Sequence, residues 1–146
     1  MTDRFEAFTM LITKIKRNIS RLKSEEMTEF NLKSSHVNCL YYISRRESLT
    51  ATELCELCGE DKAAISRALS YLEKCKLISC ESSAAQKRYN TPLSLTAAGK
   101  AVAARLSERI ARILEEASIG LDDESRRIMY ESLEIISKNL EKININ

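Results

Sequence analysis

The sequence predicts a mainly α-helical fold with one small β-hairpin, and three observations support this prediction. Helix-forming residues dominate the 146-residue chain, which holds only three glycines and one proline. Apolar residues recur every three or four positions in long segments near both ends. Residues 49–95 instead show two short helical patterns, followed by two short apolar stretches with polar residues between them. The length suits a single domain over 1–146.

Long helices at the two ends of the chain carry narrow apolar seams. The seam of the first helix comprises Phe5, Phe8, Ile12, Ile15, Ile19 and Leu22. The seam of the last helix comprises Met129, Leu133, Ile136, Leu140 and Ile143. A third long helix is expected from Thr96 to about Ser118. It carries Val102, Leu106, Ile110, Ile113 and Ala117 on one face. Narrow seams suit helix-on-helix packing. We therefore expect the chain to form a homodimer whose interface is built by the helices of residues 3–27 and 96–144. Packing within one chain is the alternative.

Capping signals place two short helices next to each other. Thr50 followed by Glu53 is a capping box, which predicts a helix from about Ala51. Gly59 can adopt the left-handed conformation that ends a helix. Asp61 is then the expected N-cap of a second helix. Two short helices joined by a few residues that include glycine form a helix-turn-helix.

The second helix of this pair has two faces of different character. Ile65, Ala68, Leu69 and Leu72 fall on one side and suit a core. The opposite side carries small and basic residues, namely Ala63, Ser66, Arg67, Ser70 and Lys74. Small side chains allow a helix backbone to approach the walls of the DNA major groove, and the basic ones attract phosphates. The alternative is an ordinary amphipathic helix with a lightly charged solvent face.

A short hairpin is expected after the helix-turn-helix. Leu77 to Cys80 has the pattern of a strand, Ser82 to Lys87 is polar, and Leu93 to Leu95 alternates as a returning strand. Pro92 cannot donate to a β-ladder, so the returning strand should be an edge strand or bulged. A helix-turn-helix followed by a two-stranded hairpin is a winged helix, here over about 33–95.

The predicted partner of this region is double-stranded DNA. The net charge of the chain is only +2, but residues 61–88 hold six basic residues and three acidic ones. Arg67 is the candidate for reading the major groove and Arg88, in the wing, for the minor groove. Lys62, Lys74 and Lys87 are candidates for neutralising phosphates. Ser34, Ser35 and Thr50 lie near helix N-termini, where they either bind phosphate or act as caps.

The chain resembles regulators of the MarR family over essentially its whole length. The matching residues are Asp61-Lys62, Ile65-Ser66-Arg67, Leu72-Glu73, Leu77-Ile78, Leu93-Ser94-Leu95-Thr96 and Gly99. The resemblance implies a single MarR-like domain, dimeric and winged, that usually represses transcription. Such regulators are released from a pseudo-palindromic operator by a small ligand or by thiol oxidation, and some relatives activate. The wing departs from the family pattern, because Gln86 stands where an acid often precedes the arginine, here Arg88.

The five cysteines and one histidine do not form a metal-binding pattern. Cys55-x-x-Cys58 has the spacing of a metal or redox pair, but a closed zinc site needs four ligands. We therefore expect no metal and no cofactor, with Cys39, Cys55 and Cys58 as buried, reduced thiols. The alternative is a thiol-redox-responsive regulator that uses Cys55 and Cys58. Relatives that sense oxidants usually carry the reactive cysteine in the first helix, which here contains none.

The remaining polar and aromatic residues point to no chemistry. His36 is expected as a partly exposed residue at the start of a helix that runs to about Arg46. Tyr41 and Tyr42 either pack in the core or line a pocket for a small-molecule effector. The chain has no nucleophile elbow, phosphate loop or paired carboxylates, so we expect no enzyme. The second hypothesis for its function is a winged-helix module that binds protein.

Composition and the N-terminus bear on location. The chain is 44% hydrophobic and 30% charged, and no apolar run approaches the roughly 20 residues that span a bilayer. The first ten residues lack the basic start and apolar core of a signal peptide. We expect a cytoplasmic protein with no membrane partner.

Overall fold

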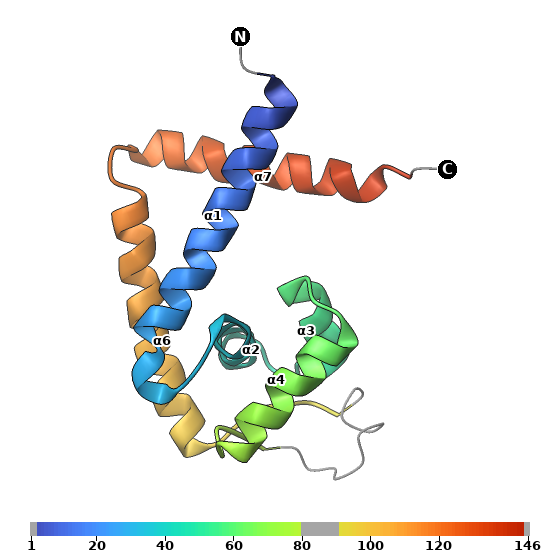
Figure 1. The fold of residues 1–146 in the computed structure, drawn as a ribbon, viewed down its shortest axis with the longest axis vertical. Coiled ribbons are helices and arrows are strands. Elements are labelled where there is room, and N and C mark those ends of the chain that lie inside the picture. Colours follow the sequence, from blue (N-terminus) through green and yellow to red (C-terminus); the bar gives the residue numbers. More distant parts are fainter. Residues whose placement is uncertain (1–2, 80–90, 145–146) are drawn as a thin grey trace. The chain divides into compact units, whose positions relative to one another are not determined.

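The computed structural model describes residues 3–79 and 91–144 (Figure 1). They belong to two compact units, Met1–Ile110 and Ala111–Asn146. The first unit holds α1 (Arg4–Glu26), the 3-10 turn η1 (Thr28–Phe30), α2 (Ser34–Arg45), α3 (Ala51–Cys58), α4 (Lys62–Lys74), β1 (Ile78–Ser79) and β2 (Ser94–Leu95). Helix α6 (Ala97–Ala117) begins in the first unit and ends in the second, which also holds α7 (Asp123–Lys142). The predicted fold class is confirmed: the chain is mainly helical, with a two-stranded antiparallel sheet in its described part.

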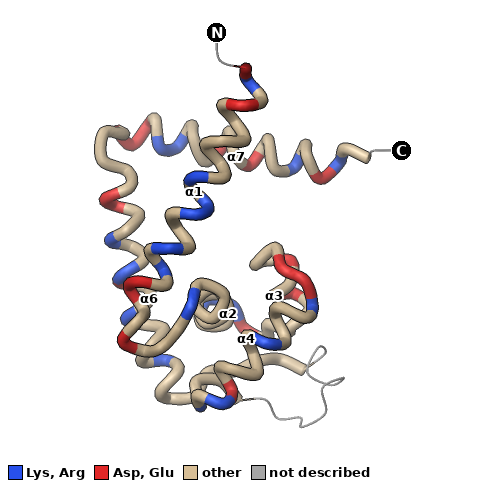
Figure 2. Tube along the Cα trace, in the orientation of Figure 1, with Lys and Arg blue, Asp and Glu red and all other residues tan. Residues whose placement is uncertain are grey.

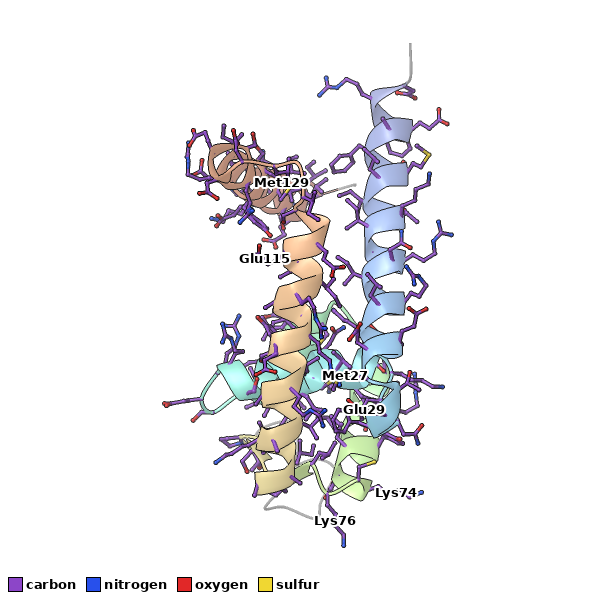
Figure 3. All side chains as sticks on the ribbon, turned by 90° about the vertical axis from the view of Figure 1, so that its left-hand side faces the viewer. Met27, Glu29, Lys74, Lys76, Glu115 and Met129 are labelled. Atoms are coloured by element: carbon purple, nitrogen blue, oxygen red, sulfur yellow. The ribbon has the colours of Figure 1, made fainter. Side chains whose placement is uncertain are left out.

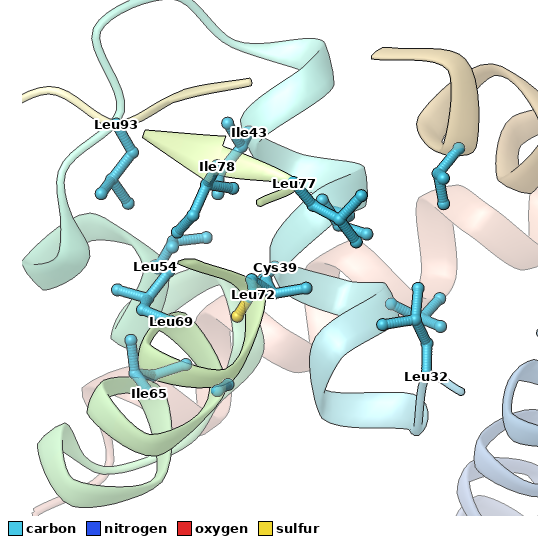
Figure 4. Packing of buried hydrophobic residues seen from close by; sticks show 14 of the residues in the cluster. Leu32, Cys39, Ile43, Leu54, Ile65, Leu69, Leu72, Leu77, Ile78 and Leu93 are labelled. Carbon is cyan, nitrogen blue, oxygen red and sulfur yellow. The ribbon is translucent and has the colours of Figure 1, made fainter. Parts of the chain in front are cut away.

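The core of the first unit forms around α2, which is seen end-on in Figure 1 between α1 and α4. Four of its twelve residues are buried, and it packs against α1, α3 and α4. The buried side chains come from α2, α3, α4, β1 and α6 and from the segments that precede α2, α3, β1 and β2 (Figure 4). They include Leu32, Cys39, Ile43, Leu54, Ile65, Leu69, Leu72, Leu77, Ile78 and Leu93. Burial of this apolar surface is the main driving force that holds α4 in place.

The helix-turn-helix begins and ends at the residues that its capping signals predict. The Thr50 hydroxyl accepts a hydrogen bond from the backbone N–H of Glu53 at 3.3 Å, and α3 starts at Ala51. Gly59 ends α3 with φ at 64°, in the left-handed region. The Asp61 carboxylate then accepts from the N–H of Ala64 at 2.8 Å and caps α4. Local signals therefore determine the change of direction between α3 and α4.

The two strands are shorter than the sequence suggests. Ile78 pairs with Leu95, and Ser79 with Ser94. Cys80 lies outside the described residues, so the end of the first strand stays a prediction. Leu93 was expected inside the second strand but precedes it, because its N–H donates to the carbonyl of Leu49 at 2.8 Å instead of to β1. This bond ties the returning strand to the segment before α3.

Thr96 and Gly99 join the hairpin to α6. The Thr96 hydroxyl donates to the carbonyl of Lys76 at 2.7 Å and accepts from the N–H of Gly99 at 3.0 Å, so it acts as the cap where we expected the first helical residue. A Cβ on Gly99 would lie 1.9 Å from the carbonyl oxygen of Leu77. Only glycine fits this contact, which gives a physical reason for the threonine and glycine in this stretch.

The middle of α6 contacts the end of α1 and the 3-10 turn η1 inside the first unit. Arg109 donates to the backbone carbonyl of Glu26 and to the carboxylate of Glu29. The guanidinium of Arg105 lies 5.1 Å from the centre of the Phe30 ring. Figure 3 shows Met27, which is fully buried, and Glu29 beside this part of α6. Charge, cation–π contact and apolar burial together fix α6 on the winged helix.

Local interactions stabilise helix α7 of the second unit. Asp122 caps it by accepting from the N–H of Ser125 at 2.7 Å. Ion pairs one turn apart follow on its surface, including Arg127 with Glu131 and Lys138 with Glu134. Ile143, expected as the last residue of the apolar seam within the helix, is instead its C-cap. Helices α1 and α7 are described in full, and neither contains a buried residue.

Candidate nucleic-acid interface

Helix α4 presents the face that the sequence predicts. Ile65, Ala68, Leu69 and Leu72 are buried. The opposite side is called here the outer face of α4, and its residues are Lys62, Ala63, Ser66, Arg67, Ser70 and Lys74. All of them are exposed except Ser66, which is partly buried. The arrangement supplies a shallow helix surface with a central guanidinium, as insertion into a major groove requires. DNA contact by these residues stays a prediction.

The basic end of this surface includes one residue that we did not single out from the sequence. Lys76 has φ at 59°, a left-handed conformation, and its N–H donates to the carbonyl of Glu73 at 2.9 Å. This turn ends α4 and leaves the Lys76 side chain exposed. Figure 3 shows Lys74 and Lys76 projecting from the same end of the helix. The only sequence signal for Lys76 was its place directly after the predicted helix.

Charge is unevenly distributed over the two helices of the motif. Figure 2 shows acidic residues along α3 and its following turn, where Glu53, Glu56 and Glu60 lie. The outer face of α4 carries three basic residues and no acidic one. A polyanion is therefore attracted to α4 and repelled from α3. This charge difference favours a complex in which α4, and not α3, faces the polyanion.

The residues proposed at helix N-termini have local partners. Thr50 is a cap, as described above. Helix α2 begins at Ser34, but Lys33 and not a serine occupies its N-cap position. The backbone N–H of Ser34 donates to the Ser24 hydroxyl of α1 at 2.9 Å. This bond occupies the Ser34 amide, which therefore does not donate to a phosphate, and it ties the start of α2 to α1. Ser35 is partly buried.

His36 connects the start of α2 to α4. Its Nδ1 accepts a hydrogen bond from the backbone N–H of Lys33 at 3.0 Å, so the ring is neutral with the proton on Nε2. The ring stacks on that of Tyr71, with 4.2 Å between centroids. The Tyr71 hydroxyl donates to the carbonyl of Asn31 at 2.6 Å. Burial, with a smaller effect of the Lys33 charge, lowers the pKa of His36.

Tyr41 and Tyr42 pack on the edge of the core. Their rings meet edge to face at 5.4 Å, and both are partly buried against the apolar cluster. Arg45 and Arg46 each place a guanidinium 5.8 Å from one of these rings. Tyr42 also lines a pocket of about 350 Å³ between α1, α2 and α3. Both tyrosines therefore pack on the core, which was one of the two expected roles. Tyr42 also lines a pocket, which was the other.

The remaining predicted site residues fall into two groups. Lys87, Arg88 and the residue before them, Gln86, lie outside the described residues. Cys39 is buried as expected, but Cys55 and Cys58, which pack against the edge of the core, are only partly buried. Within the described ranges no three histidine, cysteine, aspartate or glutamate side chains gather as metal ligands. Nor is any helix in those ranges long and apolar enough to cross a membrane.

Comparison with known proteins confirms the resemblance seen in the sequence. Residues 30–88 match the sequence model of the MarR family. These residues run from η1 through α4 to the segment after β1, and so contain the helix-turn-helix. The chain matches no curated protein sequence.

The chain shares its fold with solved structures, among them transcriptional regulators of the MarR family. A MarR transcriptional regulator from Methanosarcina mazei Go1 superposes with a TM-score of 0.85 at 21% identity, covering 99% of this chain and 95% of that one. The S. aureus MepR–DNA complex gives 0.75 at 17% identity, covering 94% and 99%. Staphylococcus aureus MarR in complex with salicylate and kanamycin gives 0.79 at 18% identity, covering 95% and 93%.

Proposed function

We propose that this chain, which has the fold of MarR-family transcriptional regulators and matches that family over residues 30–88, is a sequence-specific DNA-binding regulator. It acts as a homodimer on a pseudo-palindromic operator in the cytoplasm, represses transcription and performs no enzymatic reaction. The observation that carries this proposal is the outer face of α4, small and basic, on a helix whose other face is locked into the core. A relative of this fold has been solved with DNA.

Uncovered apolar surface supports the homodimer. Phe5 is 73% exposed and Ile15 53% exposed on α1, and Leu140 is 57% exposed on α7. A water-soluble monomer rarely leaves such continuous seams in solvent, because each buried large apolar side chain contributes about 1.5–3 kcal/mol. A second copy of the chain covers these seams. Two-fold symmetry then presents two α4 helices at a spacing of roughly 34 Å, one turn of DNA.

The residues of the outer face take different roles in this proposal. Arg67 lies in the middle of the face between small neighbours, so its guanidinium can reach the O6 and N7 atoms of guanine. Lys62 and Lys74 lie at the two ends of α4, where phosphates flank the groove. Lys87 and Arg88 of the wing are proposed for phosphate and minor groove. A small-molecule effector controls release, as supported by the relative solved with salicylate.

Salt-dependent binding to duplex DNA tests this function. Fluorescence anisotropy would compare a duplex from upstream of the protein's own gene with a scrambled duplex of equal length. We expect tighter binding to the first duplex, and affinity for both that falls steeply with salt as counterions are released. Replacing Lys74 of the outer face by alanine should weaken binding to both duplexes. Lys142→Ala, which removes an exposed charge from the end of α7, is the matched control. Binding to neither duplex, by a protein that is folded and dimeric, would favour the protein-binding module instead.

A further inference from the structure

A larger pocket lies on the side of the first unit away from α1. It has a volume of about 790 Å³ and lies between the end of α2 with its following turn, strand β2 and the first half of α6. Figure 3 shows the turn after α2 to the left of α6, and α1 with the Lys74 end of α4 to its right. This pocket shares no lining residue with the outer face of α4 or with the pocket that Tyr42 lines.

The lining of the larger pocket carries an excess of positive charge. Among the described residues, one acidic side chain lines it, Glu47, and three basic ones, namely Arg45, Arg46 and Lys100. The excess is two positive charges. A phosphate monoester carries about two negative charges at neutral pH and places them on one group. Coulomb attraction therefore favours such a group over a singly charged one.

The two arginines lie over aromatic rings and not beside carboxylates. Arg45 places its guanidinium 5.8 Å from the centre of the Tyr41 ring. Arg46 does the same over Tyr42, also at 5.8 Å. In the described part of the chain neither arginine, nor Lys100, forms an ion pair. A guanidinium that stacks on a ring keeps the N–H groups at its edge for a ligand, and these match the geometry of phosphate oxygens.

Hydroxyl groups supply the other polar part of the lining, at Ser44, Ser48, Ser94 and Ser107. Hydroxyls both donate and accept, so they suit phosphate oxygens as well as the hydroxyls of a sugar. Ser48 has φ at 56°, a left-handed conformation that residues other than glycine adopt rarely. No aromatic ring lines the pocket within the described residues. An aromatic acid therefore finds no ring on which to stack.

The floor of the pocket is apolar and belongs to the core. Ile43, Leu93 and Ala103 line it and are buried. The volume lies within the range of about 300–1,000 Å³ that is usual for small-molecule sites. It therefore admits a molecule larger than a phosphate ion. A ligand that contacts both Ser94 of β2 and Lys100 of α6 would join the hairpin to α6.

We propose that this pocket binds a hydroxyl-rich phosphate monoester of the sugar phosphate class. Arg45 and Arg46 bind the phosphate by charge-assisted hydrogen bonds, and Lys100 adds the third positive charge. The serine hydroxyls bind the hydroxyls of the sugar. Binding needs neither DNA nor a second copy of the chain. Its test is therefore independent of the proposed function.

A phosphorus NMR titration of the full-length protein, with glucose 6-phosphate as the probe, tests the site. We expect saturable broadening of the phosphorus signal and a dissociation constant of about 1 mM or below. Glucose 6-sulfate, with the same sugar and one negative charge, should displace the probe only at several-fold higher concentration. Glucose should not displace it. Absence of saturable binding, or equal displacement by the sulfate ester, would overturn the proposal.

Variants locate the bound probe. Arg46→Gln and Lys100→Gln should each weaken binding roughly three- to tenfold, since each removes an exposed partner of the phosphate. Glu47→Gln removes the acidic side chain and should tighten binding, a result that loss of folding cannot produce. Lys74→Gln removes the same charge from the outer face of α4 and should leave binding unchanged. Equal losses for Lys74→Gln and Arg46→Gln would contradict the site.

The phosphates of DNA are the other source of the same chemistry, and salt dependence distinguishes the two. Arg45→Gln and Arg46→Gln should keep the salt slope of the unmodified protein on duplex DNA. A slope smaller by about one for each variant would assign these arginines to the DNA backbone and overturn the proposal. If the protein binds no duplex at all, the proposed function fails. The titration with glucose 6-phosphate still decides the site in that case.

Discussion

The ring of His36 stacks on the ring of Tyr71 at an interplanar angle of 16° and thereby joins the first turn of α2 to the last turns of α4. His36 is the only histidine of the chain. Its Nδ1 is engaged as an acceptor by the N–H of Lys33. Protonation of this nitrogen would break the bond and place a positive charge next to Lys33. The helix that carries the candidate interface is therefore anchored through a group that titrates.

The free energy of unfolding should fall in mild acid because the folded protein disfavours the protonated form of His36. The pKa of His36 in the folded protein lies below its ordinary value of 6.5, so folding favours the neutral ring. The stabilisation is fully present above pH 6.5. It is lost as the pH falls from there through the lowered pKa, because the unfolded chain binds a proton first. Urea unfolding of wild type and His36→Phe at pH 7.5 and 5.5 measures this. The pH effect should be smaller in the variant, and equal effects would exclude His36 as its source.

Gly99 should tolerate no side chain. A Cβ there would lie 1.9 Å from a backbone oxygen, and a backbone contact cannot relax as a flexible side chain can. We expect Gly99→Ala to lower the free energy of unfolding by about 1–3 kcal/mol, the usual cost of overpacking. Ala98→Ser is the matched control, since its neighbouring position is exposed and should change stability by less than about 0.5 kcal/mol. Denaturant titration compares them, and equal midpoints would refute the contact.

Charge on the seam of α7 should disrupt the dimer. Ile136→Glu combined with Leu140→Glu places two carboxylates where a second copy is proposed to pack, and unpaired buried charge is strongly unfavourable. The variant should dissociate or unfold, as judged by light scattering and circular dichroism. Ser137→Glu adds charge at an exposed position of the same helix and should leave the dimer intact. A double variant that remains a folded dimer would show that α7 does not form the interface.

The sequence predicted the helix-turn-helix well because its boundaries depend on local chemistry. Thr50, Gly59 and Asp61 each act through backbone atoms within a few residues. Predictions failed where a distant partner decides. Lys33 rather than a serine precedes α2, and the N–H of Ser34 donates to the Ser24 hydroxyl of another helix. The partial exposure of Cys58 depends on how α3 packs, which spacing within one helix cannot reveal. The pocket that Lys23, Asn38 and Cys58 line likewise requires three helices to be placed.

Lys74 should contribute to affinity without contributing to sequence preference. Its side chain is exposed at the last residue of α4, where a phosphate is the expected partner. Lys74→Ala should weaken binding to all duplexes alike and reduce the salt slope by about one per lost contact. Anisotropy titrations over a range of salt concentrations measure this slope, with Lys142→Ala as the control. A loss confined to one base sequence would assign Lys74 to base reading.

The measurement that tests the central claim most directly is the base preference of Arg67→Ala. Arg67 is exposed in the middle of the outer face of α4, and a bidentate contact with guanine is worth about 1–3 kcal/mol. Binding of wild type and variant to a library of operator duplexes, substituted one base pair at a time, gives the preference at each position. The account predicts roughly ten- to a hundred-fold weaker specific binding, with preference lost at one position of each half-site. Unchanged affinity and unchanged base preference would contradict α4 as the helix that reads DNA.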